Sequence, residues 1–578
     1  MSNVAIKRVL VANRGEIAIR IIRTLKNMDI GAVAIYETPD ADSYHLRFAD
    51  EAVHIGDGPN SDYLNGEKII TLAKQYKIDA IHPGCGFLSE NADFAAACAA
   101  NGIIFIGPKP ETLRLFGDKL LAKKAALDSG APILPCSEAI LADERGFAVA
   151  EAFVQQYGYP VIIKSLFGGG GRGIRRVESG TRLQEHLRSA SAEAKLSTNN
   201  PLVYVEKYIA RPRHIEVQIL ADSQGRTMHL GTRDCSIQRR HQKLIEVAPA
   251  SLPEAIATSI QNLSVKLASA QGYLGAGTVE FLFDIATQEI WFMEVNGRLQ
   301  VEHTVTEMIV GVDIVEQQIL AAAGKSLSVE EVVFDGIAIE VRINAEDPQD
   351  NFNPDGGKFI ELYTLPGGPA IRVDSAIYKG YRVPSCYDSL LAKLIVKGYQ
   401  WEQTVQRLKR SLSETIIAWP KTTIPLYLTI CDEEDFKKRN YGTDYLETHP
   451  AVFDYSPHEY YIVDNSVYKT DCTNCAEEIC PLGKTVACGK TARQHPLSVP
   501  PSGLAVAEQN SVKSTIKGKV ARILVDLGDT VEAGDHLVEL EAMKMHTYIC
   551  APQAGVVVDI LFEEGDSVDV GSAIVIMK

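Results

Sequence analysis

The sequence predicts a multidomain α/β protein that ends in a small all-β domain. Three observations indicate this: the chain length, an alternation of short apolar runs with helical segments near the N-terminus, and an internal repeat near the C-terminus. A chain of 578 residues is too long for one hydrophobic core, so several domains are expected. Hydrophobic residues at 46% and charged residues at 23% are ordinary for folded domains, so extensive disorder is excluded.

The charge and the apolar pattern exclude several classes of function. A net charge of −16 gives no general attraction to nucleic-acid phosphates or anionic lipid, so neither a nucleic acid nor a membrane is expected as a partner. No stretch reaches the roughly 18 apolar residues that cross a bilayer. A strand-like run starts near Val9, so no signal peptide is expected. Most of the eleven cysteines are scattered, which fits reduced thiols and a cytoplasmic protein.

Residues 1–115 are predicted to form a parallel α/β domain. Short apolar runs alternate with helix-like segments, at residues 8–12, 32–36, 80–82 and 103–106. The first run leads into Asn13-Arg14-Gly15-Glu16, after which apolar residues recur with a helical period. A helix that begins directly after a strand is a common ligand position in such sheets.

A glycine run marks the next part of the chain. The apolar run 161–164 ends in Lys164 and is followed by glycines at 168–171 and 173. Such a run cannot stabilise a helix or a strand. Its backbone N–H groups can close over phosphates, and a linker is the alternative. Mixed strands and helices are expected over 206–335 and 336–447.

Residues 448–510 are predicted to be mostly a tether. They show no persistent amphipathic period, and residues 496–503 are typical of an exposed linker. A hairpin over 460–469 is the one regular element expected. The segment also holds Cys472, Cys475, Cys480 and Cys488. Only the first two have zinc-like spacing, so free thiols are expected and a metal site is the alternative.

Residues 511–578 contain an internal repeat. A shift of 37 residues superposes Gly518 on Gly555, and it also superposes the Gly-Asp pairs at 528–529 and 565–566. Glycine and aspartate at these positions favour turns, and the alternating Val, Ile and Leu favour a sandwich core. Two copies of one all-β half are therefore predicted. The connection between them, Ala542-Met543-Lys544-Met545, is expected to be an exposed hairpin.

That connection resembles the attachment site of biotinyl carrier domains, which implies biotin on Lys544. A lipoyl carrier has the same architecture and is the alternative. Methionine on both sides of the lysine favours biotin.

Residues 1–447 resemble a biotin carboxylase of the ATP-grasp superfamily. The segments that match, in order, are 12–16, 82–91, 117–119, 168–173, 233–243 and 296–303. The resemblance implies a biotin carboxylase N-terminal domain (1–115), an ATP-grasp domain (116–335, with a lid at about 130–205), a C-terminal carboxylase domain (336–447), the insert (448–510) and the carrier (511–578). The implied activity is ATP- and bicarbonate-dependent carboxylation of biotin through carboxyphosphate, because bicarbonate itself is a poor electrophile.

The resemblance also implies the role of each site residue. ATP is expected on Lys119, Lys164, Gly168, Gly169, Gly170, Gly171, Gly173, Glu206, Lys207, His214 and Gln238. Mg²⁺ or Mn²⁺ is expected on Glu280, Glu294 and Asn296. Bicarbonate is expected on Lys243, Arg298, Gln300 and the backbone of Val301, with Glu302 as the base. Arg342 would stabilise the enolate-like oxygen of biotin, in a pocket that includes Asp388 and Cys85.

Taken singly, several of these residues have ordinary structural interpretations. Glu280 and Glu294 could be surface carboxylates, and Arg298 with Glu302 could form a structural i,i+4 ion pair. Three positions also depart from the family pattern: Cys85 replaces a common Tyr, Phe167 replaces a Gly, and Thr304 replaces a common Pro. None of the three departures removes a catalytic side chain.

The sequence shows no carboxyltransferase domain. The resemblance therefore implies a carboxyltransferase on a separate chain, as in an acyl-CoA (acetyl or propionyl) or pyruvate carboxylase. Biotin protein ligase is a second expected partner, and a homodimer or a larger hetero-oligomer is expected. Another ATP-grasp ligase and an inactive scaffold are the alternatives. The carrier hairpin argues against the first, and the complete set of charged site residues argues against the second.

Overall fold

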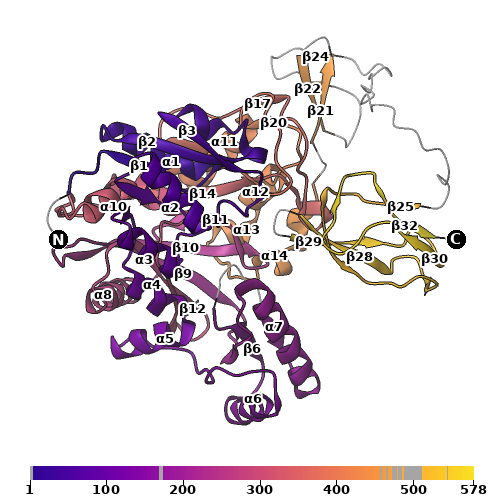
Figure 1. The fold of residues 1–578 in the computed structure, drawn as a ribbon, viewed down its shortest axis with the longest axis horizontal. Coiled ribbons are helices and arrows are strands. Elements are labelled where there is room, and N and C mark those ends of the chain that lie inside the picture. Colours follow the sequence, from indigo (N-terminus) through magenta and orange to yellow (C-terminus); the bar gives the residue numbers. More distant parts are fainter. Residues whose placement is uncertain are drawn as a thin grey trace.

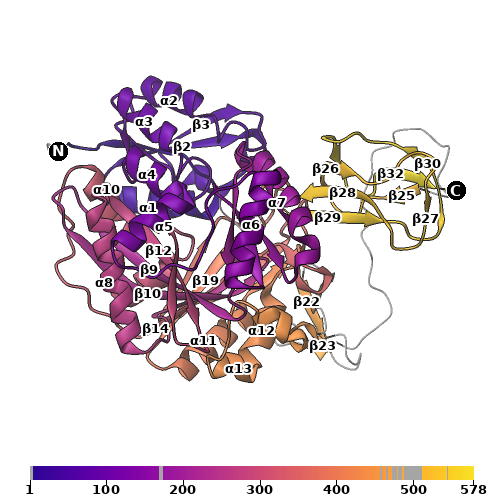
Figure 2. The ribbon, with the colours of Figure 1, turned by 90° about the horizontal axis from the view of Figure 1, so that it is seen from below.

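The computed structural model describes residues 4–167, 174–455, 511–542 and 545–577, together with four short strands between residues 458 and 486. A large α/β body is formed by the first 455 residues, and a small β domain lies beside it (Figures 1 and 2). No helix among the described residues is long and apolar enough to span a membrane.

The N-terminal unit is the predicted parallel sheet. Its strands β1 (Arg8–Val11), β2 (Gly31–Glu37), β3 (Glu51–Gly56), β4 (Ala80–His82) and β5 (Ile104–Phe105) have the order β3-β2-β1-β4-β5, and all neighbours are parallel. The helices of this unit are α1 (Gly15–Asn27), α2 (Gly66–Gln75) and α3 (Ala92–Ala100), with short turns η1 (Thr38–Asp40) and η2 (Tyr44–Arg47). The sequence missed β3 because it begins with two exposed residues and lacks an apolar run.

A second, smaller sheet forms the predicted lid. It has the order β7-β6-β8, from β6 (Val161–Ser165), β7 (Arg175–Val177) and β8 (Val203–Lys207). The helices α4 (Pro110–Gly117) and α5 (Lys119–Asp128) lead into it, and α6 (Glu144–Tyr157), η3 (Gly180–Arg182) and α7 (Leu183–Thr198) belong to it. Side chains of α6 and α7 share one apolar core with the sheet. The glycine run between β6 and β7 lies outside the described residues.

An eight-stranded antiparallel sheet is the centre of the body. Its order is β13-β12-β9-β10-β11-β14-β19-β18, from β9 (Pro212–Ala221), β10 (Thr227–Arg239), β11 (Gln242–Ala248), β12 (Gly275–Asp284), β13 (Ile290–Asn296), β14 (Ile337–Asn344), β18 (Ile371–Ser375) and β19 (Leu390–Gly398). Because β11 pairs with β14, the units predicted at 116–335 and 336–447 share one sheet.

The remaining elements of the body are helices and short strands, and the short strands form two separate pairs, β15-β16 and β17-β20. The helices are α8 (Glu254–Ala270), α9 (His303–Val310), α10 (Ile314–Ala322), α11 (Trp401–Glu414), α12 (Ile424–Asp432), α13 (Glu434–Lys437) and α14 (Tyr445–Thr448). The short elements are β15 (Glu346–Asp347), η4 (Pro348–Asp350), β16 (Asn353–Pro354), β17 (Leu362–Thr364), β20 (Ile416–Ala418) and η5 (Pro450–Phe453).

The insert contains more regular structure than the sequence predicted. The strands β21 (His458–Val463) and β22 (Ser466–Asp471) form the predicted hairpin, with Val463 paired to Ser466. They continue into β23 (Glu478–Ile479) and β24 (Thr485–Val486) as a four-stranded sheet. The prediction of a mostly irregular tether missed β23 and β24, because strands of two residues carry no alternating pattern. Cys472, Cys475, Cys480 and Cys488 lie outside the described residues.

The C-terminal domain is a sandwich of two four-stranded sheets. Its strands are β25 (Ser511–Lys513), β26 (Gly518–Ile523), β27 (Thr530–Val531), β28 (His536–Ala542), β29 (Met545–Cys550), β30 (Gly555–Ile560), β31 (Ser567–Val568) and β32 (Ala573–Met577). The sheet orders are β25-β32-β30-β27 and β29-β28-β26-β31. A shift of 37 residues, the length of one repeat, places each of the first four strands of the domain on a strand of the other sheet. The turn glycines also match, with φ of 95° at Gly528 and 101° at Gly565, so the predicted repeat is confirmed.

Candidate active site

A cavity of about 550 Å³ collects the predicted site residues. It lies where the N-terminal unit, the lid and the central sheet meet. All predicted residues within the described ranges line it: Cys85, Lys119, Lys164, Glu206, Lys207, His214, Gln238, Lys243, Glu280, Glu294, Asn296, Arg298, Gln300, Val301, Glu302, Arg342 and Asp388. The predicted glycines Gly168, Gly169, Gly170, Gly171 and Gly173 and the predicted attachment residue Lys544 lie outside the described residues.

A row of carboxylates crosses three neighbouring strands of the central sheet. Glu216 of β9 is paired with Glu280 of β12, and Glu280 is paired with Glu294 of β13. Like charges directly opposite each other on a sheet are destabilising. The row therefore requires cations close to it.

Lys243 of β11 supplies one of those cations. Its Nζ bonds to a carboxylate oxygen of Glu216, and it lies 3.2 Å from Glu280 Oε1 and 2.7 Å from Glu302 Oε1. Arg233 is completely buried and donates to Glu216 Oε2 at 2.9 Å. Lys243 and Arg233 together bind the carboxylates of Glu216, Glu280 and Glu302, which lie on β9, on β12 and directly before α9.

Glu302 is held ionised by its neighbours. Burial alone would raise its pKa, but the charges of Lys243, Arg342 and Arg233 outweigh burial and hold the pKa of Glu302 well below its ordinary value. Arg342 Nη2 donates to Glu302 Oε2 at 3.0 Å, and Arg342 Nε donates to Glu246 Oε1 at 2.6 Å. Glu302 thus has the charge state that a general base needs.

Arg298 has a different partner from the one that sequence spacing suggests. Its Nε donates to Glu90 Oε2 at 3.1 Å and its Nη2 donates to Asn296 Oδ1 at 3.0 Å. Residue 298 precedes α9, which begins at His303, so a helical i,i+4 ion pair with Glu302 is not formed. Arg298 instead joins the N-terminal unit to the central sheet.

The carboxylates of Glu280 and Glu294 fit a divalent cation. Glu280 is buried, and it accepts hydrogen bonds from His214 Nε2 at 2.9 Å and from Asn296 Nδ2 at 2.7 Å. Burial raises the pKa of Glu294, and the negative charge of Glu280 adds to this while Lys119 opposes it. Two facing carboxylates with a nearby amide are a hard oxygen donor set that suits Mg²⁺. The interpretation as surface carboxylates is wrong for Glu280.

The lid side of the cavity combines lysines with an apolar wall. Lys164 Nζ and Lys123 Nζ each lie 2.5 Å from Glu206. Burial would raise the pKa of Glu206, but the two lysines lower it to about 2. Apolar side chains line the same region: Leu134, Ile162, Ile174, Leu282 and Met293. A flat apolar ring can lie between such walls while the lysines face an anion.

Several residues that build the site were given no role in the sequence analysis, although three of them (Glu16, Glu90 and Arg233) lie in segments quoted there. They are Glu16, Glu90, Glu216, Arg233, Glu246 and Lys393, each of which pairs with a predicted residue or with another of this set. Lys393 is fully buried, and its Nζ donates to the carbonyl of Val301 at 2.9 Å. A lysine flanked on both sides by apolar residues in β19 (Leu390–Gly398) was the signal that could have identified it.

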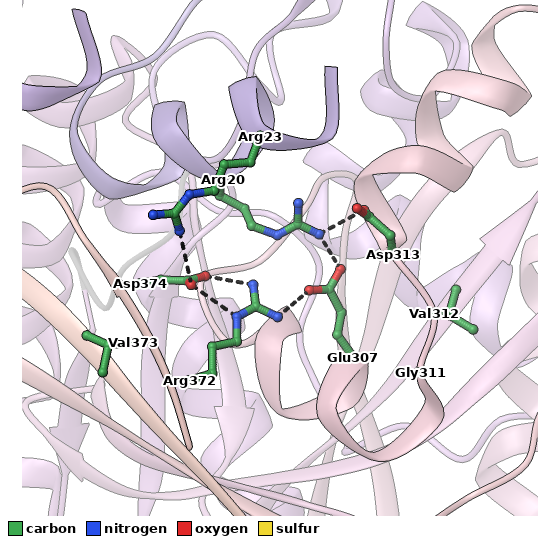
Figure 3. Close-up of a pocket in the computed structure, with 9 residues that line it drawn as sticks. All are labelled: Arg20, Arg23, Glu307, Gly311, Val312, Asp313, Arg372, Val373 and Asp374. Atoms are coloured by element: carbon green, nitrogen blue, oxygen red, sulfur yellow. Dashed lines mark hydrogen bonds and ion pairs between the residues drawn. The ribbon is translucent and has the colours of Figure 1, made fainter. Parts of the chain in front are cut away.

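A second hollow, of about 400 Å³, lies outside the cavity (Figure 3). Its charged groups pair with one another: Arg372 contacts Glu307 and Asp374 at 2.7 Å, and Arg20 contacts Glu307 at 2.6 Å. Asp374 of β18 is paired in register with Lys393 of β19. The carboxylate of Asp374 therefore lies on the strand next to Lys393, and its negative charge helps to raise the pKa of that lysine.

The three departures from the family pattern are accommodated locally. Cys85 lines the cavity as a protonated thiol, because burial raises its pKa to about 11. Thr304 donates its hydroxyl to the buried carboxylate of Glu340, a bond that proline could not make. The backbone carbonyl of Phe167 accepts a hydrogen bond from Ser165 Oγ at 2.6 Å.

The fold and the cavity together define an ATP-dependent ligase. Profiles of four domain families match the chain: "Biotin carboxylase, N-terminal domain" at 5–113, "Carbamoyl-phosphate synthase L chain, ATP binding domain" at 118–330, "Biotin carboxylase C-terminal domain" at 340–448 and "Biotin-requiring enzyme" at 510–577.

Individual relatives give the same result. Biotin carboxylase 1 of Bacillus subtilis is 46% identical over 451 residues, which are 77% of this chain and 99% of that protein. Pyruvate carboxylase of B. subtilis is 47% identical over 467 residues, which are 79% of this chain and 40% of that protein. The biotin carboxylase domain dimer of Hydrogenobacter thermophilus 2-oxoglutarate carboxylase, solved with MgADP, ADP and bicarbonate, has a TM-score of 0.76 at 46% identity and covers 78% of this chain and 99% of that one.

The chain belongs to the biotin carboxylase family and carries a biotinyl domain in addition. It is an ATP-dependent ligase that carboxylates biotin with bicarbonate, and ATP, Mg²⁺ and biotin are its cofactors.

The buried carboxyl of Glu246 predicts a pH dependence of this activity. Burial raises the pKa of Glu246 to about 7, the charge of Arg342 opposes this and that of Glu302 adds to it. As the pH rises through about 7, Glu246 becomes ionised and fixes Arg342 against Glu302. We expect kcat/KM for bicarbonate-dependent ATP cleavage to rise over the same interval. Glu246→Gln should lose that limb of the pH profile and about tenfold in rate.

The matched control is Glu254→Gln, which changes an exposed residue of α8. Its pH profile should follow that of the unsubstituted chain. An unchanged limb near pH 7 in the Glu246→Gln profile would show that another group titrates there.

Proposed function

We propose that this chain carboxylates biotin attached to its own Lys544 and passes the carboxyl group to a carboxyltransferase on a separate chain. The observation that carries the proposal is the presence of a biotin carboxylase cavity and a biotinyl sandwich in one chain. Ala542 of β28 is paired with Met545 of β29, so Met543 and Lys544 connect the two strands. This register supports Lys544 as the attachment residue.

On the ATP side, we propose that Lys119 and Lys164 neutralise phosphates under the glycine run at 168–173. Glu206 and Lys207 would contact the adenine, and His214 with Gln238 the ribose. The hydrogen bond between Gln238 Nε2 and His214 Nδ1, at 2.7 Å, supports a shared task for that pair. Glu280, Glu294 and Asn296 would hold Mg²⁺, which would neutralise charge on the transferred phosphoryl group.

On the bicarbonate side, we propose that Lys243, Arg298, Gln300 and the backbone of Val301 hold the anion. Glu302 is ionised and lies beside both Lys243 and Arg342, which supports its role as the base that removes the bicarbonate proton. Arg342 would then face the enolate-like oxygen of biotin, with Asp388 and Cys85 lining the same pocket.

The final acceptor and the assembly are part of this proposal. We propose that the chain is a subunit of an acyl-CoA (acetyl or propionyl) or pyruvate carboxylase. The relatives include carboxylases of pyruvate and of 2-oxoglutarate, and the first supports pyruvate among these acceptors. We propose a homodimer in the cytoplasm, modified by a biotin protein ligase. The solved relative that is a dimer of biotin carboxylase domains supports the homodimer. The free thiols of the described cysteines support the cytoplasmic location.

The purified biotinylated chain should cleave ATP only when bicarbonate is present, and the chain without attached biotin should need free biotin as well. Neither should form a carboxylated acyl-CoA or 2-oxo acid. Lys544→Arg should abolish avidin binding and transfer of ¹⁴C from bicarbonate to the chain. The same variant should still carboxylate free biotin, because its cavity is unchanged. A carboxylated acyl product from the pure chain would contradict the proposal.

Lys393 is proposed as a positioning residue for bicarbonate. Its Nζ joins the Val301 carbonyl to Glu16 Oε2, the latter at 3.1 Å. Val301 and Glu302 are adjacent, so the position of this carbonyl also determines where the base lies. Removing the ammonium would leave the Val301 carbonyl and the Glu16 carboxylate without their cation in a buried site.

Lys393→Met should therefore raise the KM for bicarbonate about tenfold while changing kcat less, measured well below the unfolding temperature. Lys397→Met is the matched control, because Lys397 lies on the same strand and pairs with Asp335 outside the cavity. A lowered melting temperature with an unchanged KM would assign Lys393 a structural role only.

A further inference from the structure

Strand β29 of the carrier domain contacts the body. Thr547 Oγ1 of β29 donates to Asn353 Oδ1 at 2.8 Å, and β29 contacts β16 at the same place. Figures 1 and 2 show that the β28–β29 end of the domain is the end that faces the body. Thr547 is buried, on the same side of the strand as Ile549 in the domain core. A buried hydroxyl needs a hydrogen-bond partner, and the other domain supplies it.

The amide of Asn353 is oriented to receive this bond. Its Nδ2 donates to Asp350 Oδ2 at 2.9 Å, so its Oδ1 is turned toward Thr547. Asn353 lies on a hairpin in which β15 pairs with β16, with Asp347 opposite Asn353 and Glu346 opposite Pro354.

The loop that presents Asn353 is fixed in an uncommon conformation. Asn351 and Phe352 both have positive φ, at 51° and 59°, which non-glycine residues adopt rarely and only when their surroundings enforce it. Phe352 is 3% exposed and packs in the core of the C-terminal unit. The Arg239 guanidinium lies 4.6 Å from its ring centroid and also donates to the Asn351 carbonyl. Contacts within the body therefore hold the backbone of this loop without help from the carrier.

The other side of the same hairpin is a wall of the active-site cavity. Glu346 lines the cavity and accepts a hydrogen bond from Ser389, which lines it too. Asn353 is paired across the hairpin with Asp347, which is next to Glu346. The strand spacing and the rise per residue therefore put the Cα atoms of Asn353 and Glu346 within roughly 10 Å of each other. On the carrier side, Met545 is two residues from Thr547, or about 7 Å along the strand, and Lys544 is the next residue.

We propose that the β15–β16 hairpin is the docking site for the chain's own carrier domain while biotin occupies the carboxylase cavity. This inference rests on the proposed function of Lys544. The contact places Thr547 on one side of this hairpin, and Glu346 on its other side lines the cavity. Biotin on Lys544 would reach over the hairpin into the cavity through the lysine side chain and the valeryl chain. The partner is identified by the buried threonine hydroxyl that matches an oriented asparagine carbonyl.

The small size of this contact suits a carrier that must leave again. A stable interface between separate proteins buries about 1,600 Å², whereas a tethered domain needs far less because its effective concentration is on the order of millimolar. One oriented hydrogen bond at a rigid loop selects a position without holding the domain permanently.

The test compares biotin on the chain with biotin in solution. Single-turnover transfer of ¹⁴C from bicarbonate to the chain's own biotin should fall about fivefold in Thr547→Val and in Asn353→Ala, the effect of one hydrogen bond. Asn353→Arg, which blocks the surface, should reduce it on the order of tenfold or more. Thr547→Ser, which keeps the hydroxyl, should recover most of the rate. Carboxylation of free biotin should be unchanged in every variant.

Two matched controls separate docking from general effects. Thr530→Val changes an exposed threonine of β27, at the end of the carrier far from the body (Figure 2). Asn262→Arg changes an exposed residue of α8. Both should transfer ¹⁴C at the original rate, and an avidin gel shift should show equal biotinylation of all variants.

The combined variant Thr547→Val/Asn353→Ala should lose no more than either single variant, because both remove the same bond. The docking site alone would be overturned if the loss of rate in the combined variant were the product of the two single losses. An unchanged rate in Asn353→Arg would overturn it as well. Absence of ¹⁴C on both free and attached biotin in the unsubstituted chain would overturn the proposed function instead.

Discussion

The site depends on a set of buried charges that water cannot screen. Lys243 and Arg233 lie among the carboxylates of Glu216, Glu280 and Glu302. Removing an ion from water costs several kcal/mol, and only close opposite charges and hydrogen bonds offset that cost. Each member is therefore required by the others, and the loss of one leaves an uncompensated charge in the sheet.

This constraint explains the order of the central sheet. Glu216 and Glu280 must lie on adjacent strands for one lysine to reach both, and β9 pairs with β12. Arg342 must reach Glu302 from the C-terminal unit, and the pairing of β11 with β14 brings it there. The sheet is continuous across residue 335 through the pairing of β11 with β14, and the ion pairs of Arg342 with Glu246 and Glu302 cross the same boundary. For this reason the two halves form one catalytic body, although the sequence divides them into two units.

The sequence predicted what local pattern can express. Apolar runs gave four of the five parallel strands, and paired glycines gave the two-sheet sandwich. The predicted site residues that fall within the described ranges all line one cavity. Their partners could not be predicted, because pairs such as Arg298–Glu90 and Lys393–Val301 join residues far apart in the chain. No spacing rule connects such residues until the units have packed together.

The same limit applies to the contact between the carrier and the body. Neither Asn353 nor Thr547 stands out in the sequence, and Asn353 follows two residues of positive φ that Arg239 and the core around Phe352 contact. Ordering a loop at the moment of docking would cost roughly 1 kcal/mol or more for each residue. With the body already rigid, the carrier alone loses freedom when it docks. A contact this small can then direct the swinging domain to the cavity and still release it in each cycle.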